Sequence, residues 1–221
     1  MLIAIDGTAG TGKSSVGKAI AAKLGYGFLS TGEMYRALAY KVFEKNIVPE
    51  DHDAVLEAAR QLRFTFARQP DASLKMFVDG EYLGAKLHLE EVGNVASRVS
   101  TNGEARRVLT EKMRDVGEEG GIVMEGRDVG TVVFPDAEMK FYLDASAEER
   151  AKRRVKQLQE AGEHPHYEEI LKLIKERDYR DSHRAVSPLK PAEDAIIIDT
   201  SALNMQQVTD TVWEKIQHYA S

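Results

Sequence analysis

The sequence has no cysteine among its 221 residues, which excludes disulfide bonds and thiolate metal sites. It has no run of about 18 apolar residues, so we expect no membrane-spanning helix. No repeat, low-complexity tract or linker rich in proline, glycine and serine divides it. An apolar segment begins at Leu2, so we expect no signal or transit peptide. The lack of cysteine fits a reducing compartment, and we expect a cytoplasmic protein with no membrane partner.

Positive charge is scarce as well. The 30 lysine and arginine residues are outnumbered by 36 aspartate and glutamate residues, which gives a net charge of −6 and argues against nucleic acid as a partner. A protein of this charge that binds several phosphates must gather its cations locally. Hydrophobic residues make up 43% of the chain, enough for a core, and nothing in the sequence requires more than a monomer.

The clearest motif lies in the first fourteen residues, where an apolar run leads into GTAGTGKS and then at once into a helical pattern. This is the phosphate-binding P-loop, G-x-x-x-x-G-K-[ST], in its strand-to-helix context. Its glycines let backbone N–H groups converge on an anion, and the helix N-terminus adds partial positive charge. The alternative, a glycine-rich turn without a ligand, lacks a reason for the complete motif.

Within this motif, Lys13 is expected to reach the β- and γ-phosphates of ATP, and the Ser14 hydroxyl to be a ligand of Mg²⁺. The expected ATP-binding residues are Gly7, Thr8, Ala9, Gly10, Thr11, Gly12, Lys13, Ser14 and Ser15.

Strand-like apolar runs alternate with helical stretches, at residues 2–5, 26–29, 121–124, 140–143 and 195–199. This alternation predicts an α/β fold of the P-loop type, with three layers and a central five-stranded parallel sheet flanked by helices. The pattern breaks at residues 63–87, where Asp79-Gly80 between two alternating runs, 75–78 and 81–83, predicts a hairpin in a small antiparallel insert. Helices are expected over residues 88–100 and 103–118.

Two clusters of polar residues follow predicted strands, where ligands bind in open α/β sheets. Ser30 to Arg36 opens a helix, and Arg36 there either grips a phosphate or is a surface arginine beside a helix cap. Glu125 to Gly130 places three charged residues at the end of a central strand, where Arg127 and Asp128 either bind a ligand or form a buried structural pair.

Arginines also recur on single helix faces on both sides of a predicted turn at residues 160–167, which contains Gly162 and His164-Pro165-His166. The pattern favours two rows of phosphate ligands around a short helical lid, while Arg153 and Arg180 are interpreted as parts of a solvated, salt-bridged face. His164 and His166 are interpreted as polar loop residues. The rows are Arg150, Arg153 and Arg154, and then Arg177, Arg180 and Arg184.

A P-loop alone does not define the reaction. The guanine-reading Asn-Lys-x-Asp segment of GTPases is missing, and the apolar strand that ends in Asp or Asp-Glu in motor and transport ATPases has only Met124-Glu125-Gly126 as its nearest match. Small size, arginine rows and a lid turn favour a kinase of small metabolites. Other nucleoside monophosphate kinases and a nucleotide-dependent switch without an acceptor remain open alternatives.

The chain resembles the bacterial cytidylate kinases from end to end. The segment GRDVGTVVFP at residues 126–135 and the Arg/Asp segment ending at Leu189 separate this family from the adenylate, guanylate and shikimate kinases. The matching segments are residues 5–14, 31–36, 91–99, 126–135, 143–154 and 175–189.

The resemblance implies one P-loop kinase domain over residues 1–221. Its core would comprise about residues 1–62 and 119–221, its nucleotide-monophosphate-binding insert about 63–118 and its lid about 148–168. It also implies phosphoryl transfer from ATP to CMP or dCMP with Mg²⁺, in pyrimidine nucleotide metabolism, giving ADP and CDP or dCDP.

Residue roles follow from the same resemblance. A monophosphate site would use Thr31, Tyr35 and Arg36 with Arg127, and the cytosine would be read by Ser97, Arg106 and Asp128. Asp181 would hold the ribose hydroxyls, with Arg177 and Arg184 close to sugar and phosphates. The implied catalytic residues are Lys13, Arg127, Arg150, Arg154 and Arg184. Three positions depart from the family pattern and bear on affinity, namely Ser30, Glu33 and His88.

Overall fold

The computed structural model describes residues 1–69 and 74–219. None of the helices in these two ranges is long and apolar enough to cross a membrane. The elements are, in order, β1 (Leu2–Gly7), α1 (Lys13–Leu24), β2 (Gly27–Ser30), α2 (Thr31–Glu44), α3 (His52–Gln61), β3 (Phe64–Arg68), β4 (Leu74–Val78), the 3₁₀ turn η1 (Gly84–His88), α4 (Glu90–Val99), α5 (Gly103–Gly117), β5 (Ile122–Glu125), the π-helical turn η2 (Val129–Val133), β6 (Met139–Asp144), α6 (Ala147–Glu160), α7 (Tyr167–His183), β7 (Ile196–Asp199) and α8 (Met205–Tyr219).

The main sheet has five strands in the order β2-β5-β1-β6-β7, and β1 pairs in parallel with β6, as β6 does with β7. Every residue of β1 and β5 is buried, as expected for inner strands covered by helices on both faces. The five strands predicted from apolar runs are therefore confirmed, within two residues at their ends, and so is the α/β fold.

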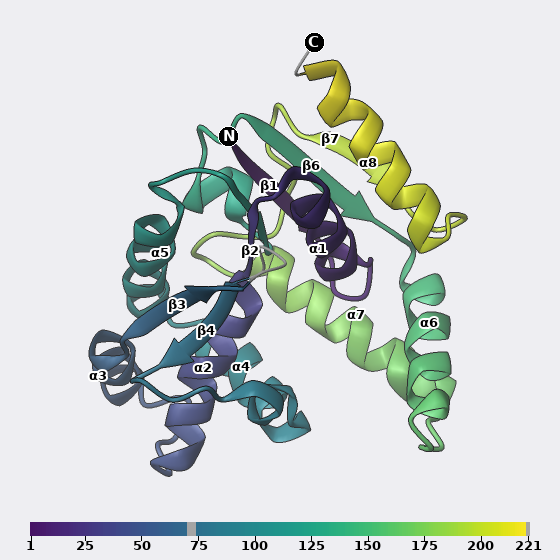
Figure 1. Ribbon diagram of the computed structural model, residues 1–221. Helices are drawn as coiled ribbons and strands as arrows, with labels where there is room; N and C mark the ends of the chain where they lie inside the picture. Colours follow the sequence, from purple (N-terminus) through teal and green to yellow (C-terminus); the bar gives the residue numbers. More distant parts are fainter. Residues whose placement is uncertain (70–73, 220–221) are drawn as a thin grey trace. The chain divides into compact units, whose positions relative to one another are not determined.

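Contacts within the chain define two compact units, residues 1–20 with 125–221, and residues 21–124. In the first unit, β1, β6 and β7 lie side by side, and α6 and α7 pack against each other as a helical pair (Figure 1). The side chain of Ser146 caps α6 by accepting a hydrogen bond from the Glu149 N–H. The turn predicted at residues 160–167 is confirmed, since it joins α6 to α7.

The second unit contains the antiparallel pair β3–β4, with Phe64 opposite Val78, together with helices α2 to α5 (Figure 1). The Asp79-Gly80 turn is confirmed, with φ values of 52° and 83° that suit a tight turn. The strand expected after it is wrong. Only a single bridge joins Val78 to Glu81, and Leu83 leads directly into η1. The strand β4 pairs instead with β3, and residues 70–73 between them lie outside the described ranges.

Gly7 shows how closely the strands of the first unit pack at the start of the P-loop. Its φ is +144°, and a Cβ added there would lie 2.0 Å from the carbonyl oxygen of Leu143 on β6. Because that oxygen belongs to the sheet backbone, it cannot move aside as a side chain would.

We therefore expect Gly7→Ala to lower the free energy of unfolding by about 3–5 kcal/mol, measured by urea unfolding followed by circular dichroism. Gly162→Ala is the matched control, because Gly162 also has a positive φ, of +85°, but no heavy atom lies within 4 Å of the added Cβ. This control should lose only about 1 kcal/mol. Equal losses in the two variants would show that backbone conformation, not the collision with Leu143, governs the site.

Candidate active site

The P-loop fills the turn between β1 and α1, and the helix begins at Lys13. Gly10 and Gly12 have φ values of 83° and 93°, a conformation that favours glycine. The methyl group of Met205, at the start of α8, lies over Gly12, where it would be 2.8 Å from an added Cβ. The predicted strand, loop and helix are thus all in place around a backbone suited to binding an anion.

Lys13 is buried at 4% exposure, and its ammonium donates to the carbonyl oxygen of Thr8 at 2.6 Å and to Thr11 Oγ1 at 3.5 Å. Burial, followed by the positive charge of Arg127, lowers the pKa of Lys13 to about 7. Because both acceptors are neutral, a nearby anion would stabilise the buried ammonium of Lys13. Phosphate oxygens beside it would restore its charge and raise its pKa.

A cavity of about 530 Å³ opens over the P-loop in the first unit. Its lining includes arginine side chains from α6 and apolar side chains from residues 203–208. This combination can hold a charged phosphate chain and the flat apolar face of a base. The lining residues are Gly10, Thr11, Gly12, Lys13, Ser14, Ser15, Arg150, Arg153, Arg154, Gln157, Leu203, Asn204, Met205 and Val208.

The Ser14 hydroxyl donates to the carboxylate of Glu125 over 3.1 Å, and Glu125 is buried at 5% exposure at the end of β5. A hydroxyl and a carboxylate oxygen are the hard donors that Mg²⁺ binds in proteins, usually completed by phosphate oxygens and water. The described residues contain no cluster of three or more His, Asp or Glu side chains able to hold a metal without such help. The pair therefore fits an ion that arrives with a nucleotide.

Asp6 was not expected among the site residues, yet it anchors the loop after β5. Its two carboxylate oxygens accept the backbone N–H groups of Val129 and Gly130 at 2.8 and 2.7 Å. Burial raises its pKa to about 6, although the two N–H groups act in the opposite direction. The sequence feature that could have indicated this contact is an acidic residue at the end of an apolar strand, directly before the P-loop.

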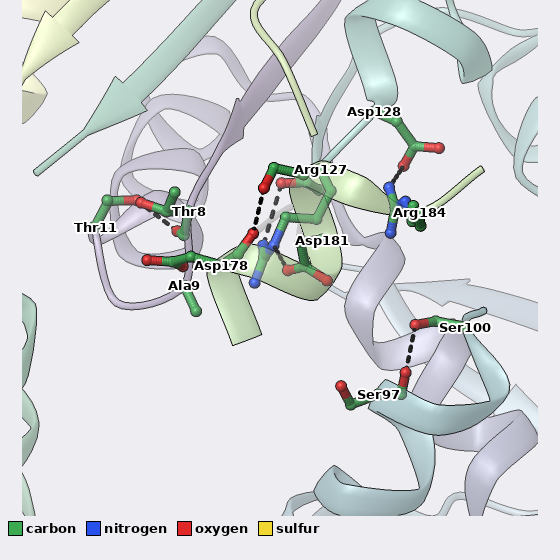
Figure 2. Close-up of polar contacts among 12 residues, drawn as sticks. Thr8, Ala9, Thr11, Ser97, Ser100, Arg127, Asp128, Asp178, Asp181 and Arg184 are labelled. Carbon is green, nitrogen blue, oxygen red and sulfur yellow. Dashed lines mark hydrogen bonds and ion pairs between the residues drawn. The ribbon is translucent and has the colours of Figure 1, made fainter. Parts of the chain in front are cut away.

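The acceptor-side residues of the first unit form ion pairs across long stretches of sequence, as Figure 2 shows. Arg127 Nε donates to Asp181 at 3.0 Å, and its Nη1 donates to the carbonyl oxygen of Gly126. The Arg184 guanidinium lies 3.6 Å from the Asp128 carboxylate, and both side chains are less than 10% exposed. Arg177 is half-buried on α7, and its charge contributes to the lowered pKa of Lys13.

The arginines of α6 differ in their surroundings. Arg150 is buried and bonded to the protein at several points, while Arg154 is exposed and donates to Gln157 at 2.9 Å. The solvated face expected for Arg153 is wrong, because its guanidinium donates to Thr200 Oγ1 at 3.3 Å and to the carbonyl oxygen of Leu203. Those acceptors tie α6 to the segment that walls the cavity. Arg180, by contrast, is exposed as expected, and so are His164 and His166.

In the second unit, α2 presents Thr31 at its first, buried position and Tyr35 and Arg36 one turn later. The guanidinium of Arg106, from α5, lies 5.0 Å from the centre of the Tyr35 ring, and its Nη1 donates to the carbonyl oxygen of Ser100. This unit thus brings Tyr35 and Arg106 together.

Two further residues of this unit were also predicted to bind the acceptor. Arg36 donates to the carbonyl oxygen of Leu87 at 2.9 Å, which keeps it beside η1 and not on an open surface. Ser97 lies on α4, and its carbonyl oxygen accepts the Ser100 hydroxyl (Figure 2). Of the three departures from the family pattern, Ser30 is buried, Glu33 is half-buried and His88 is exposed.

Comparison with known proteins agrees with this arrangement. The family model described as cytidylate kinase matches residues 3–218. The chain is 41% identical to the cytidylate kinase of Pasteurella multocida over 99% of this chain and 96% of that protein. It is 43% identical to the cytidylate kinase of Caldanaerobacter subterraneus subsp. tengcongensis, over 97% and 94% of the two chains.

Among solved structures, a shikimate kinase from Bacteroides thetaiotaomicron matches 99% of this chain and 97% of its own length, with a TM-score of 0.50 and 13% identity. A likeness at that identity supports the fold alone. The family model matches nearly the whole of this chain, and both relatives are matched over nearly their whole lengths. These matches show that the chain belongs to the cytidylate kinase family.

Proposed function

We propose that this protein transfers the γ-phosphoryl group of ATP to the phosphate of CMP or dCMP, giving ADP and CDP or dCDP. The observation that carries the proposal is the P-loop cavity with a buried Lys13 and arginines from α6, in a chain of the cytidylate kinase family. That the enzyme acts as a monomer in the cytoplasm stays a prediction from its sequence, as does the division into core, insert and lid.

On the donor side, the backbone N–H groups of residues 7–15 surround the β- and γ-phosphates, and Lys13 neutralises them. Ser14, with Glu125 beside it, would hold Mg²⁺ together with phosphate oxygens. When bound, the ion shields the negative charge of the phosphates and fixes their orientation. Arg150 and Arg154 supply further positive charge from α6.

On the acceptor side, the arginines and carboxylates of the ion pairs in the first unit would bind the nucleotide in place of each other. Arg127 and Arg184 would turn toward the acceptor phosphate, which releases Asp181 for the ribose hydroxyls and Asp128 for the exocyclic amine of cytosine. Ser97 and Arg106 would donate to the base, and Thr31, Tyr35 and Arg36 would line the phosphate. Arg177 would lie near the sugar and the phosphates.

The chemical step needs no general base, because a phosphate monoester is already a dianionic nucleophile near neutral pH. One of its oxygens forms a bond to the γ-phosphorus while the bond from that phosphorus to the β–γ bridging oxygen breaks, and ADP leaves with the electron pair. Lys13, Arg127, Arg150, Arg154 and Arg184 stabilise the charge that spreads over the transferred group. The protein accelerates the step by positioning and by electrostatic stabilisation.

The acceptor is tested by ADP formation from Mg-ATP with CMP, dCMP, UMP, AMP, GMP, shikimate or no acceptor. We expect rapid turnover with CMP and dCMP, and at least about tenfold less with UMP. Preference for another acceptor would leave a kinase but discard the cytosine assignment. ATP binding without acceptor-dependent turnover would support a nucleotide-dependent switch instead.

The lowered pKa of Lys13 makes nucleotide binding dependent on proton uptake. At pH 8 a lysine of pKa about 7 is mostly neutral, and the phosphates of ATP favour its charged form, so binding should take up close to one proton. Calorimetric titration of ATP in HEPES and in Tris would show this, because the measured enthalpy should rise with the ionisation enthalpy of the buffer. The Lys13→Met variant should lose the buffer dependence. The same dependence in that variant would assign the proton to another group.

Asp128 is expected to select cytosine through its acceptor oxygens. Asp128→Asn places a donor where the carboxylate only accepts, so the ratio of kcat/KM for CMP to that for UMP should fall by about tenfold or more. Steady-state kinetics with both acceptors would measure it. Asp136→Asn is the matched control, because Asp136 is exposed in the loop just after η2 and belongs to no expected contact. An unchanged ratio in Asp128→Asn would contradict the base-reading role.

A further inference from the structure

A carboxylate with no assigned role lies against one of the donor-side cations. Asp178, on α7, forms a two-pronged ion pair with Arg150, on α6. Its Oδ1 accepts from Nη1 at 3.0 Å and its Oδ2 accepts from Nη2 at 2.6 Å. Two parallel hydrogen bonds of this kind define the plane of a guanidinium as well as its place.

Two further contacts complete the geometry of Arg150. Its Nε donates to the carbonyl oxygen of Ala145 at 2.9 Å, and its Nη1 also donates to the carbonyl oxygen of Ala9 in the P-loop at 3.2 Å. A guanidinium has five N–H donors, and these contacts use four. One Nη2–H of Arg150 has no acceptor among residues 1–69 and 74–219, and Arg150 lines the cavity over the P-loop.

The charge of Asp178 matters because Arg150 is almost fully removed from water, with 4% of its side chain exposed, against 23% for Asp178. A buried guanidinium needs a counter-ion, and it lies in a unit where Arg127 and Arg177 already lower the pKa of Lys13. Asp178 supplies that counter-ion from the side of α7. It therefore allows a further cation to stay beside the P-loop before any phosphate arrives.

We propose that Asp178 is a positioning residue for the phosphate donor. It holds the Arg150 guanidinium against the P-loop carbonyl of Ala9 and leaves one N–H of that guanidinium for an oxygen of the ATP phosphates. The inference rests on the proposed function of the cavity as the ATP site. It assigns Asp178 no contact with either nucleotide.

A simple brace between α6 and α7 is the competing explanation. The same two helices carry a second ion pair, Lys175 with Glu148 at 2.9 Å, in which both side chains are about half exposed. This pair joins α6 to α7 without contacting Arg150 or the P-loop. Lys175→Gln is therefore a matched control that removes a bridge between the helices and leaves Arg150 in place.

The test compares Asp178→Asn, Lys175→Gln, Arg150→Gln and the double variant Arg150→Gln/Asp178→Asn. In Asp178→Asn we expect kcat/KM for ATP to fall by about tenfold or more, while KM for CMP changes by less than about twofold. Lys175→Gln should keep both constants. In the Arg150→Gln background, Asp178→Asn should change kcat/KM for ATP by less than about twofold, because the group through which it acts is gone.

Three outcomes would overturn the proposal. They are equal losses in Asp178→Asn and Lys175→Gln, equal losses toward ATP and CMP, and a full additional loss in the Arg150→Gln background. If Asp178→Asn does not fold, Asp178→Glu takes its place, since it keeps the charge and moves the carboxylate by one methylene. It should raise KM for ATP and leave KM for CMP unchanged, and an unaltered KM for ATP would contradict the positioning role.

The dissociation constant of ATP, measured calorimetrically without an acceptor, separates this proposal from the proposed function. If the wild-type protein binds ATP but does not phosphorylate CMP, the proposed function fails. A weaker ATP affinity in Asp178→Asn, but not in Lys175→Gln, would still support the positioning role. Equal affinity in the wild type and in Asp178→Asn would contradict it.

Discussion

The structure of the first unit depends on keeping several cations together and largely out of water in a chain whose net charge is −6. Lys13 and Arg150 are buried in the cavity that the P-loop forms, and burial disfavours the charged state of each. Neither would be stable there without acceptors nearby. For Lys13 these are a carbonyl and a hydroxyl of the P-loop itself, and for Arg150 they are Asp178 and two carbonyls.

The acidic residues around the site have different tasks. Asp6 accepts only backbone N–H groups, and so it shapes the loop after β5. Asp128 and Asp181 are paired with arginines that could instead bind a phosphate of the substrate. Each arginine would then exchange a carboxylate for a phosphate, so substrate binding need not bury an additional charge. Such an exchange favours ligands that satisfy both members of a pair. A phosphate alone would leave a buried carboxylate without its cation.

Much of the fold and part of the site could be predicted from the sequence. The P-loop, the five strands and the α6–α7 turn have local causes, namely glycines at positive φ, apolar runs and a short polar segment between helices. Ion pairs could not be predicted in the same way. Arg150 with Asp178 and Arg127 with Asp181 join residues 28 and 54 positions apart, and helical spacing shows that residues share a face without showing what meets that face. Arg153 was misinterpreted for the same reason, since its acceptors are the Thr200 hydroxyl and the carbonyl oxygen of Leu203, which lie 47 and 50 positions away in the sequence.

The helix α7 links the two halves of the proposed reaction. Asp178 and Asp181 are three residues apart, so they lie on one face of the helix with a rise between them of about 4.5 Å. The first holds Arg150 beside the P-loop, and the second holds Arg127 after β5. In-line transfer requires the donor and acceptor phosphates to meet at a defined separation. A rigid helix that carries Asp178 for Arg150 and Asp181 for the acceptor ribose helps to keep that separation constant, because any displacement of α7 moves both carboxylates together.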